Sequence, residues 1–222
     1  NANVQFIPGS DRIILRAKGE LTVRTLEGVV TCSKSINTEA ANAFLPEMFS
    51  SDATIAVSWN SYGDRAGDIR IWDLEQCTVS DPILIFSEVA RQMSVSSDGR
   101  SVLTGSSAGY TFYMFDTQTG QLRFSLSGFD AEFSANGKQV FVVESESVNA
   151  YDVDTGKYLY PAVETESDYM TNIVVSPDDQ LIALSNDPYR NYHFFRIGDN
   201  SLLAGCRREH RNGRSREERC VE

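Results

Sequence analysis

Short apolar runs separated by turn-forming residues recur along the whole chain. In Asp68–Asp73 the apolar residues Ile69 and Ile71 alternate with polar or charged neighbours, as in a half-buried strand. Residues 140–143 are apolar without alternation, which predicts a strand covered on both faces. The pattern therefore predicts short β-strands joined by hairpin-sized connections, with little helix.

Five segments share one layout. Each has an apolar residue, a turn, an apolar strand, a loop, and a second strand that ends in an aromatic residue and usually an acid. The leading apolar residues are Phe6, Phe49, Val95, Phe133 and Val175, spaced 43, 46, 38 and 42 residues apart. Self-similarity at such a period indicates a repeat architecture, in which each repeat is one supersecondary unit.

Each repeat leaves room for a fourth strand before the next one begins. We therefore predict an all-β propeller of about five four-stranded antiparallel blades, at residues 4–34, 47–86, 93–127, 131–161 and 172–205. No strand is shared between the two ends of this array. An open ring, or part of a larger propeller, is therefore the alternative to a small closed ring.

Two kinds of turn recur with the repeats. Asp98-Gly99 and Asn136-Gly137 stand between apolar runs, where a tight hairpin needs a positive φ that glycine adopts without strain. A second turn follows the aromatic–acid pair, and residues 116–120 match residues 152–156 in having an initial Asp and a final Gly. In the second repeat Cys77 takes the place of that glycine.

The strand ends resemble a known family. Ile69–Asp73 is similar to the strand-end signature of WD-repeat propellers, and residues 96–99 and 176–179 resemble the first hairpin of that family. The resemblance covers residues 4–205 and implies a non-enzymatic scaffold that presents rim loops to protein or peptide partners. The residues assigned to the repeat signature are Trp72, Asp73, Phe115, Asp116, Tyr151 and Asp152.

The chain departs from that family in two respects. No copy carries the Gly-His pair that opens many WD repeats, so the family's buried Asp–His–Ser/Thr–Trp network is not expected around Trp72. Trp72 and Asp73 are instead expected to pack and to cap a turn. The first and fifth copies also lack the acid, which Leu26 and Arg196 replace.

Charge is unevenly distributed along the chain. The formal net charge is −11, but residues 206–222 hold six Arg and four Glu, which leaves −13 for residues 1–205. A body this acidic repels phosphate backbones and favours basic partners. The basic segment 206–222 has no apolar residue between Cys206 and Cys220, so a disordered tail is expected.

The four cysteines, Cys32, Cys77, Cys206 and Cys220, show no paired spacing. We interpret them as free thiols in a reducing compartment. No apolar run approaches the ~20 residues that span a bilayer, and none of the twelve Asn lies in an N-glycosylation sequon. An intracellular, cytoplasmic location with no membrane contact is the resulting expectation.

Candidate binding residues are the aromatic and Arg side chains of loops that would share one rim of a propeller, because these side chains supply most interface energy. They are Tyr62, Arg65, Arg91, Tyr110, Tyr169, Tyr189 and Arg190. The expected partner is a protein or peptide with basic character. Self-association, or further blades that complete the ring, is a second expected kind of contact.

Catalytic and metal-binding patterns are absent from the sequence. His193 lies within a predicted strand and is interpreted as structural, and no spacing matches a metal-ligand motif. We expect no catalytic residue, no metal and no cofactor. The alternatives are an enzyme or ligand-binding propeller of the lactonase or quinone-cofactor type, and an accessory propeller of a larger multidomain enzyme, since the turns at 116–121 and 152–157 also occur in such proteins.

Overall fold

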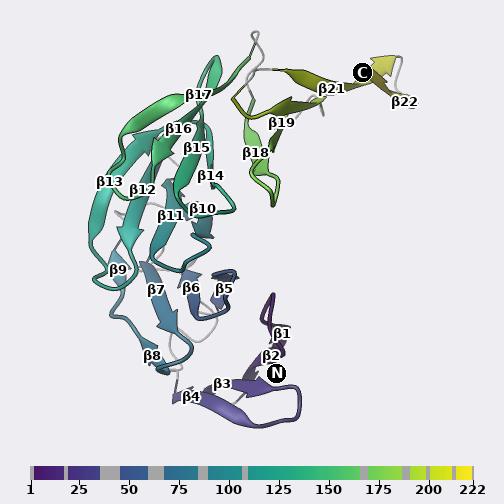
Figure 1. The fold of residues 1–222 in the computed structure, drawn as a ribbon. Coiled ribbons are helices and arrows are strands. Elements are labelled where there is room, and N and C mark those ends of the chain that lie inside the picture. Colours follow the sequence, from purple (N-terminus) through teal and green to yellow (C-terminus); the bar gives the residue numbers. More distant parts are fainter. Residues whose placement is uncertain are drawn as a thin grey trace. The chain divides into compact units, whose positions relative to one another are not determined.

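The computed structural model describes residues 3–17, 20–35, 46–59, 68–84, 90–106, 110–165, 170–186, 191–198, 201–211 and 214–221. Within these ranges every regular element is a β-strand, and the strands form five antiparallel sheets in chain order (Figure 1). The all-β class and the five-blade organisation predicted from the sequence are confirmed. We name the sheets blade 1 to blade 5.

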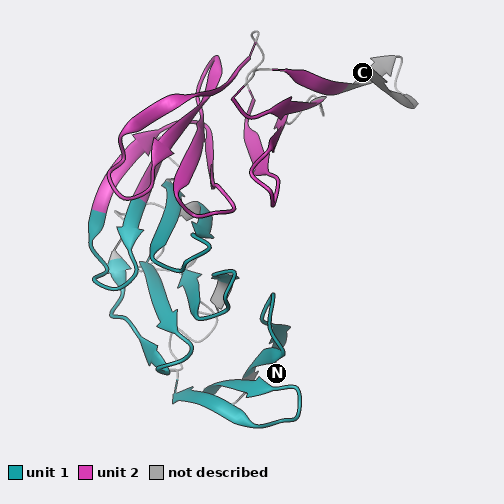
Figure 2. Cartoon of the chain, in the orientation of Figure 1, with its two compact units in different colours: residues 1–108, 114–122 teal, residues 109–113, 123–222 magenta. Residues whose placement is uncertain are grey.

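Blades 1 and 2 lie wholly in the first of two compact units, which comprises residues 1–108 and 114–122 (Figure 2). Blade 1 has the strand order β1-β2-β3-β4, and blade 2 has the order β5-β6-β7-β8, with β9 also paired to β7. The strands of these two blades are β1 (Asn3–Phe6), β2 (Arg12–Ala17), β3 (Glu20–Thr25), β4 (Val30–Ser35), β5 (Pro46–Phe49), β6 (Ile55–Trp59), β7 (Asp68–Asp73), β8 (Thr78–Val79) and β9 (Ile83–Leu84).

Blade 3 contributes to both units, and blades 4 and 5 lie in the second, which comprises residues 109–113 and 123–222. Blade 5 extends the four-stranded plan by one strand, β22, which pairs with β21. The strands are β10 (Ala90–Val95), β11 (Ser101–Ser106), β12 (Thr111–Asp116), β13 (Leu122–Ser127), β14 (Asp130–Phe133), β15 (Gln139–Val143), β16 (Ser147–Asp152), β17 (Tyr158–Glu164), β18 (Asn172–Val175), β19 (Leu181–Asn186), β20 (Asn191–Arg196), β21 (Leu202–Arg211) and β22 (Arg214–Val221).

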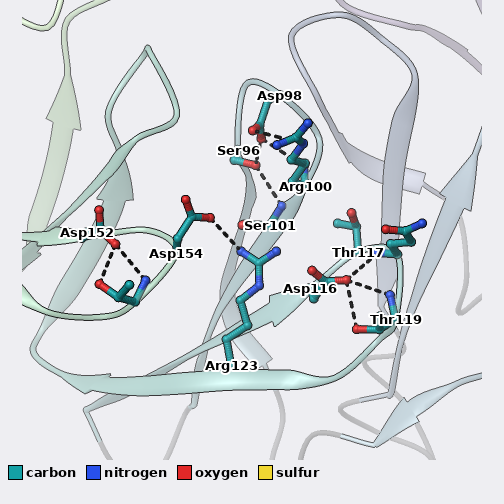
Figure 3. Close-up of polar contacts among 12 residues, drawn as sticks. Ser96, Asp98, Arg100, Ser101, Asp116, Thr117, Thr119, Arg123, Asp152 and Asp154 are labelled. Atoms are coloured by element: carbon teal, nitrogen blue, oxygen red, sulfur yellow. Dashed lines mark hydrogen bonds and ion pairs between the residues drawn. The ribbon is translucent and has the colours of Figure 1, made fainter.

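The first turn of each blade is closed by side chains. In blade 3 the Ser96 hydroxyl donates to Asp98 Oδ1 at 2.7 Å and accepts from the Ser101 backbone N–H at 3.0 Å (Figure 3). Gly99 completes the turn with a φ of 69°. Serines at the equivalent positions of three other blades make the same two contacts; they are Ser50, Ser134 and Ser176.

The aromatic–acid pair also has a local structural role. Asp116 Oδ1 accepts hydrogen bonds from the backbone N–H groups of Gln118 and Thr119 (Figure 3). Asp73 Oδ1 does the same for Glu75 and Gln76. The turn after Asp73 places Cys77 at a φ of 54°, the position that glycine holds in later repeats. These acids therefore close turns between the third and fourth strands.

Strand register corrects one assignment made from the sequence. Thr25 pairs with Arg12 in the way that Asp73 pairs with Ile55, so Thr25 holds the acid position of blade 1. Leu26 holds the next position, which corresponds to Leu74. The N–H of Leu26 bonds to Asp11 O, as the N–H of Leu74 bonds to Thr54 O. The prediction at Leu26 was wrong because only the hairpin register distinguishes the two neighbouring positions.

The interpretation of Cys32 and Cys77 as free thiols was wrong. The two residues form a disulfide, with a Cα–Cα distance of 5.2 Å, between β4 of blade 1 and the turn that follows β7 of blade 2. No short spacing marks the two cysteines as a pair, because 45 residues separate them. The cysteines therefore do not indicate a reducing compartment, and an intracellular location stays a prediction.

The expected disordered tail also differs from the structure. Residues 202–211 and 214–221 pair as β21 and β22, with Cys206 opposite Cys220 in the register. Backbone pairing needs no apolar side chains, which is why the composition of this segment did not predict it. The described part of the chain contains no helix that is long and apolar enough to cross a membrane.

Candidate functional site

Antiparallel strand order gathers certain connections at one end of each blade. In a four-strand meander the link from second to third strand lies at the same end as the links to the neighbouring blades. We call this end, with its connecting residues, the loop end. In blade 4 the backbone shows the convergence, because Phe129 N–H bonds to Val143 O and Thr165 N–H bonds to Glu146 O.

Tyr110 is the aromatic residue that the structure fixes at the loop end. It precedes β12 in the link from the second to the third strand of blade 3, and it is 61 % exposed. Its ring meets Phe129 edge to face, with centroids 5.1 Å apart, and its carbonyl accepts a 2.8 Å hydrogen bond from Gly128 N–H. The exposed Tyr110 ring thus has an aromatic neighbour, and the Tyr110 backbone is bonded to the link that carries this neighbour.

Gly128 is required for that arrangement. A Cβ at this position would collide with Val142 Cγ1 and lie 2.7 Å from Val143 O. The link from blade 3 to blade 4 can therefore approach β15 closely only if it lacks a side chain here. This close approach brings the Phe129 ring into contact with the Tyr110 ring.

Two carboxylates lie at the loop end of blade 4. Glu144, Ser145 and Glu146 form the link between β15 and β16, and Glu146 is exposed. Glu144 Oε1 accepts a 2.6 Å hydrogen bond from the Tyr151 hydroxyl, which fixes this half-buried carboxylate. Burial and this bond to Glu144 raise the pKa of Tyr151, so its hydroxyl stays a donor.

Two further carboxylates, Asp130 and Glu132, lie on β14. Asp130 is buried, and its Oδ2 accepts a 2.8 Å bond from the Ile173 N–H of the next blade, while its Oδ1 accepts from the Ala131 N–H. The pKa of Glu132 is raised to about 7. Burial is the main cause and the charge of Asp130 adds to it, while a hydrogen bond from Phe133 N–H partly lowers the pKa. Asp130 therefore has a structural role between blades 4 and 5, and Glu132 titrates near neutrality.

The remaining sequence candidates for binding are only partly placed. Tyr62, Arg65, Tyr169, Tyr189 and Arg190 lie outside the described residues. Arg91 belongs to β10 and not to a loop. Both of its neighbours pair with β11, Ala90 with Ser106 and Gln92 with Gly105, and a register shift lies between these two pairs. The prediction of Arg91 as a loop residue was therefore wrong.

Sequence reasoning missed Gly128 and Phe129, which contact Tyr110. Gly128 alone carried a local signal, as a glycine between two apolar strands without a turn partner. His193 lies on β20 and stacks on Phe195 with ring centroids 6.2 Å apart. Across the described ranges, no group of three or more His, Cys, Asp or Glu side chains could hold a metal ion.

A scan against protein-family models found no match, and a search of curated proteins found none.

Proposed function

We propose that this chain is a non-enzymatic interaction module of the WD-repeat type that binds a protein or peptide partner at its loop end. The position shared by Trp72, Phe115 and Tyr151, one residue before a turn-capping Asp, supports the WD-like assignment. Short, buried strands fix the blades and leave the connecting residues to make contacts.

The observation that carries the proposal is the exposed ring of Tyr110, which packs edge to face on Phe129. Binding normally costs entropy when a mobile side chain is ordered at an interface. The edge-to-face contact with Phe129 restricts the Tyr110 ring, so part of that cost is met in the free protein. Rigid, exposed Tyr side chains are typical interface anchors.

The partner that fits this surface has basic character. Glu144 and Glu146 lie at the loop end of blade 4, and residues 1–205 carry a formal charge of −13. Acidic side chains at the loop end favour Lys or Arg side chains in a partner through charge, and the exposed Tyr110 ring offers such a cation a cation–π contact. Charge at an interface rim acts mainly on association rate and specificity, so the aromatic contact supplies most of the affinity.

Tyr110→Ala tests the proposal, with Tyr158→Ala as the matched control. Both tyrosines are exposed and both meet another aromatic ring edge to face, but Tyr158 lies on the fourth strand β17 and not at the loop end. The probe is an array of Lys- and Arg-containing peptides, whose hits are measured again in solution by fluorescence anisotropy.

We expect Tyr110→Ala to weaken binding at least about tenfold, as loss of an anchor worth more than ~1.4 kcal/mol does. Tyr158→Ala should leave binding unchanged, and added salt should slow association. Equal loss in both variants, or no binding to any basic peptide at low ionic strength, would contradict the proposal.

A further inference from the structure

Cys206 and Cys220 occupy directly opposed positions in the antiparallel pair β21–β22 of blade 5. The described pairing of β21 with β20 runs from Leu202 to Cys206, whereas its pairing with β22 runs from Gly205 to Arg211. The two cysteines therefore stand where the hairpin β21–β22 joins the rest of its sheet.

A register shift aligns these two cysteines. A regular ladder counted from the opposed pair Arg211 and Arg214 would place Arg219 opposite Cys206. One extra residue on β22 changes the register, so that Cys220 takes this position instead. Irregularities of this kind re-aim individual residues of a strand, and here the result is that two cysteines face each other.

The distance between opposed positions suits a covalent bond. Directly opposed residues of an antiparallel pair share one face of the ladder, with Cα atoms about 4.5–5.5 Å apart. Disulfides join residues whose Cα atoms lie about 4.4–6.8 Å apart. The disulfide already present in this chain, Cys32–Cys77, has a Cα–Cα distance of 5.2 Å. The register of Cys206 and Cys220 therefore allows a bond without movement of the backbone.

The other two cysteines do not compete for this bond. The chain has four cysteines, and Cys32 and Cys77 are bonded to each other. Cys206 and Cys220 are thus left as a pair, in a chain that already carries one disulfide.

The hairpin between the two cysteines has little else to hold it together. Residues 207–219 include no apolar side chain. Arg207 lies opposite Arg219 and Arg211 lies opposite Arg214, and like charges in directly opposed positions destabilise a pair of strands. A two-stranded hairpin is marginally stable in water even without such repulsion. A covalent link at its base would offset these deficits.

We propose that Cys206 and Cys220 form a second disulfide, which closes the hairpin β21–β22 where it joins blade 5. The oxidant is a small-molecule disulfide of the glutathione class. One cysteine thiolate attacks that disulfide and releases one small-molecule thiol, and the other cysteine then attacks the mixed disulfide and releases the second. The two electrons and two protons that the protein loses are thus carried away on two small-molecule thiols.

The test maps the thiols of the folded full chain in a buffer of glutathione and glutathione disulfide. After an acid quench, free thiols are alkylated in denaturant, and the protein is digested with trypsin without a reductant. A cross-link between the peptide of residues 197–207 and the peptide that begins at Cys220 identifies the bond. The matched control combines Arg219→Cys with Cys220→Ser, which moves one thiol by a single residue and so to the opposite face of the ladder.

We expect Cys206 and Cys220 of the wild type to lose the alkylation label and to appear in the cross-linked peptide. The control should yield no cross-link, with both thiols alkylated or joined to glutathione. Circular dichroism establishes that the control is folded. If it is not, Cys206→Ser replaces it, and Cys220 should then be alkylated or joined to glutathione.

Three results would overturn the proposal. The first is a wild type in which both Cys206 and Cys220 remain alkylated. The second is a cross-link from either of them to Cys32 or Cys77. The third is a control that cross-links as fully as the wild type, because the strand register would then not be what joins the two cysteines.

Discussion

Trp72 Nε1 donates a 2.8 Å hydrogen bond to Ser58 Oγ inside the core that joins blades 1 and 2. Both residues are buried, at 3 % and 0 % exposure. The bond gives the indole N–H an acceptor in the absence of a histidine. It therefore replaces part of the Asp–His–Ser/Thr–Trp network of WD repeats, for which this chain has no histidine near Trp72. The contribution of this bond to the free energy of unfolding can be measured, which tests the structural role of Trp72 in the repeat signature.

Ser58→Ala should destabilise the protein by about 1–3 kcal/mol, because it leaves the Trp72 N–H buried without a partner. The free energy of unfolding from urea titration measures this cost. In a Trp72→Phe background the same Ser58→Ala change should cost clearly less, because no donor then remains. Equal costs in the two backgrounds would show that the hydrogen bond is not what Ser58 contributes.

Thr104→Val should stabilise the protein by about 1 kcal/mol. Thr104 is the blade 3 equivalent of Ser58, but Phe115 holds the Trp72 position and has no donor. Its buried hydroxyl has no hydrogen-bond partner among the described residues. Replacing such a group with an apolar isostere removes the cost of an unsatisfied polar atom.

Thr22→Val is the matched control for Thr104→Val. Thr22 is also a buried strand threonine, but its Oγ1 donates to Leu15 O and accepts from Arg24 Nε. We expect Thr22→Val to lower the midpoint of urea unfolding and Thr104→Val to raise it. A loss of stability in both variants would mean that Thr104 is satisfied by a partner such as buried water.

Loss of the Cys32–Cys77 disulfide should destabilise the protein by about 4 kcal/mol, the chain-entropy value for a closed loop of this size. The sequence separation is 45 residues. The double variant Cys32→Ala with Cys77→Ala is compared with the oxidised wild type by urea unfolding. Peptide mapping without reductant should recover a cross-linked peptide that contains both cysteines, and two separate peptides would contradict the pairing.

Stability should fall as pH rises from about 4.5 to about 7, because the folded state holds a proton on Glu132 more tightly than the unfolded chain does. The full shift corresponds to about 3 kcal/mol. Glu132→Gln should remove most of this slope when unfolding is measured at about pH 5 and about pH 8. Glu146→Gln, an exposed carboxylate on the same blade, should leave the slope intact.

How far the sequence predicts the structure depends on whether a signal is local. The turns at Gly99 and Gly137 were predictable. Their backbone needs a positive φ, which favours glycine, and a glycine between two apolar runs is visible in the sequence. The fully apolar run Val140–Val143 was also informative, and all four of its residues are buried. Local chemistry of this kind sets the strands and their order within each blade.

Relationships between distant residues were not predictable. Cys32 and Cys77 meet only because consecutive blades stack, and four cysteines permit three pairings. Tyr110 was a candidate from its residue type and loop position, but its contact with Phe129 depends on the close approach of Gly128 to β15. Pairing of β21 with β22 uses backbone groups, which carry no sequence signal.

The disulfide also bears on how easily blade 1 opens locally. A cross-link raises the free energy of opening the segments that it joins, because it removes chain entropy from the open state. The Cys32–Cys77 bond ties the amino-terminal repeat to its neighbour, so amides of β18 and β19 should exchange with solvent through cheaper local openings than those of β2 and β3. A thiol reductant would then erase this difference in exchange, so that redox conditions set how readily blade 1 opens.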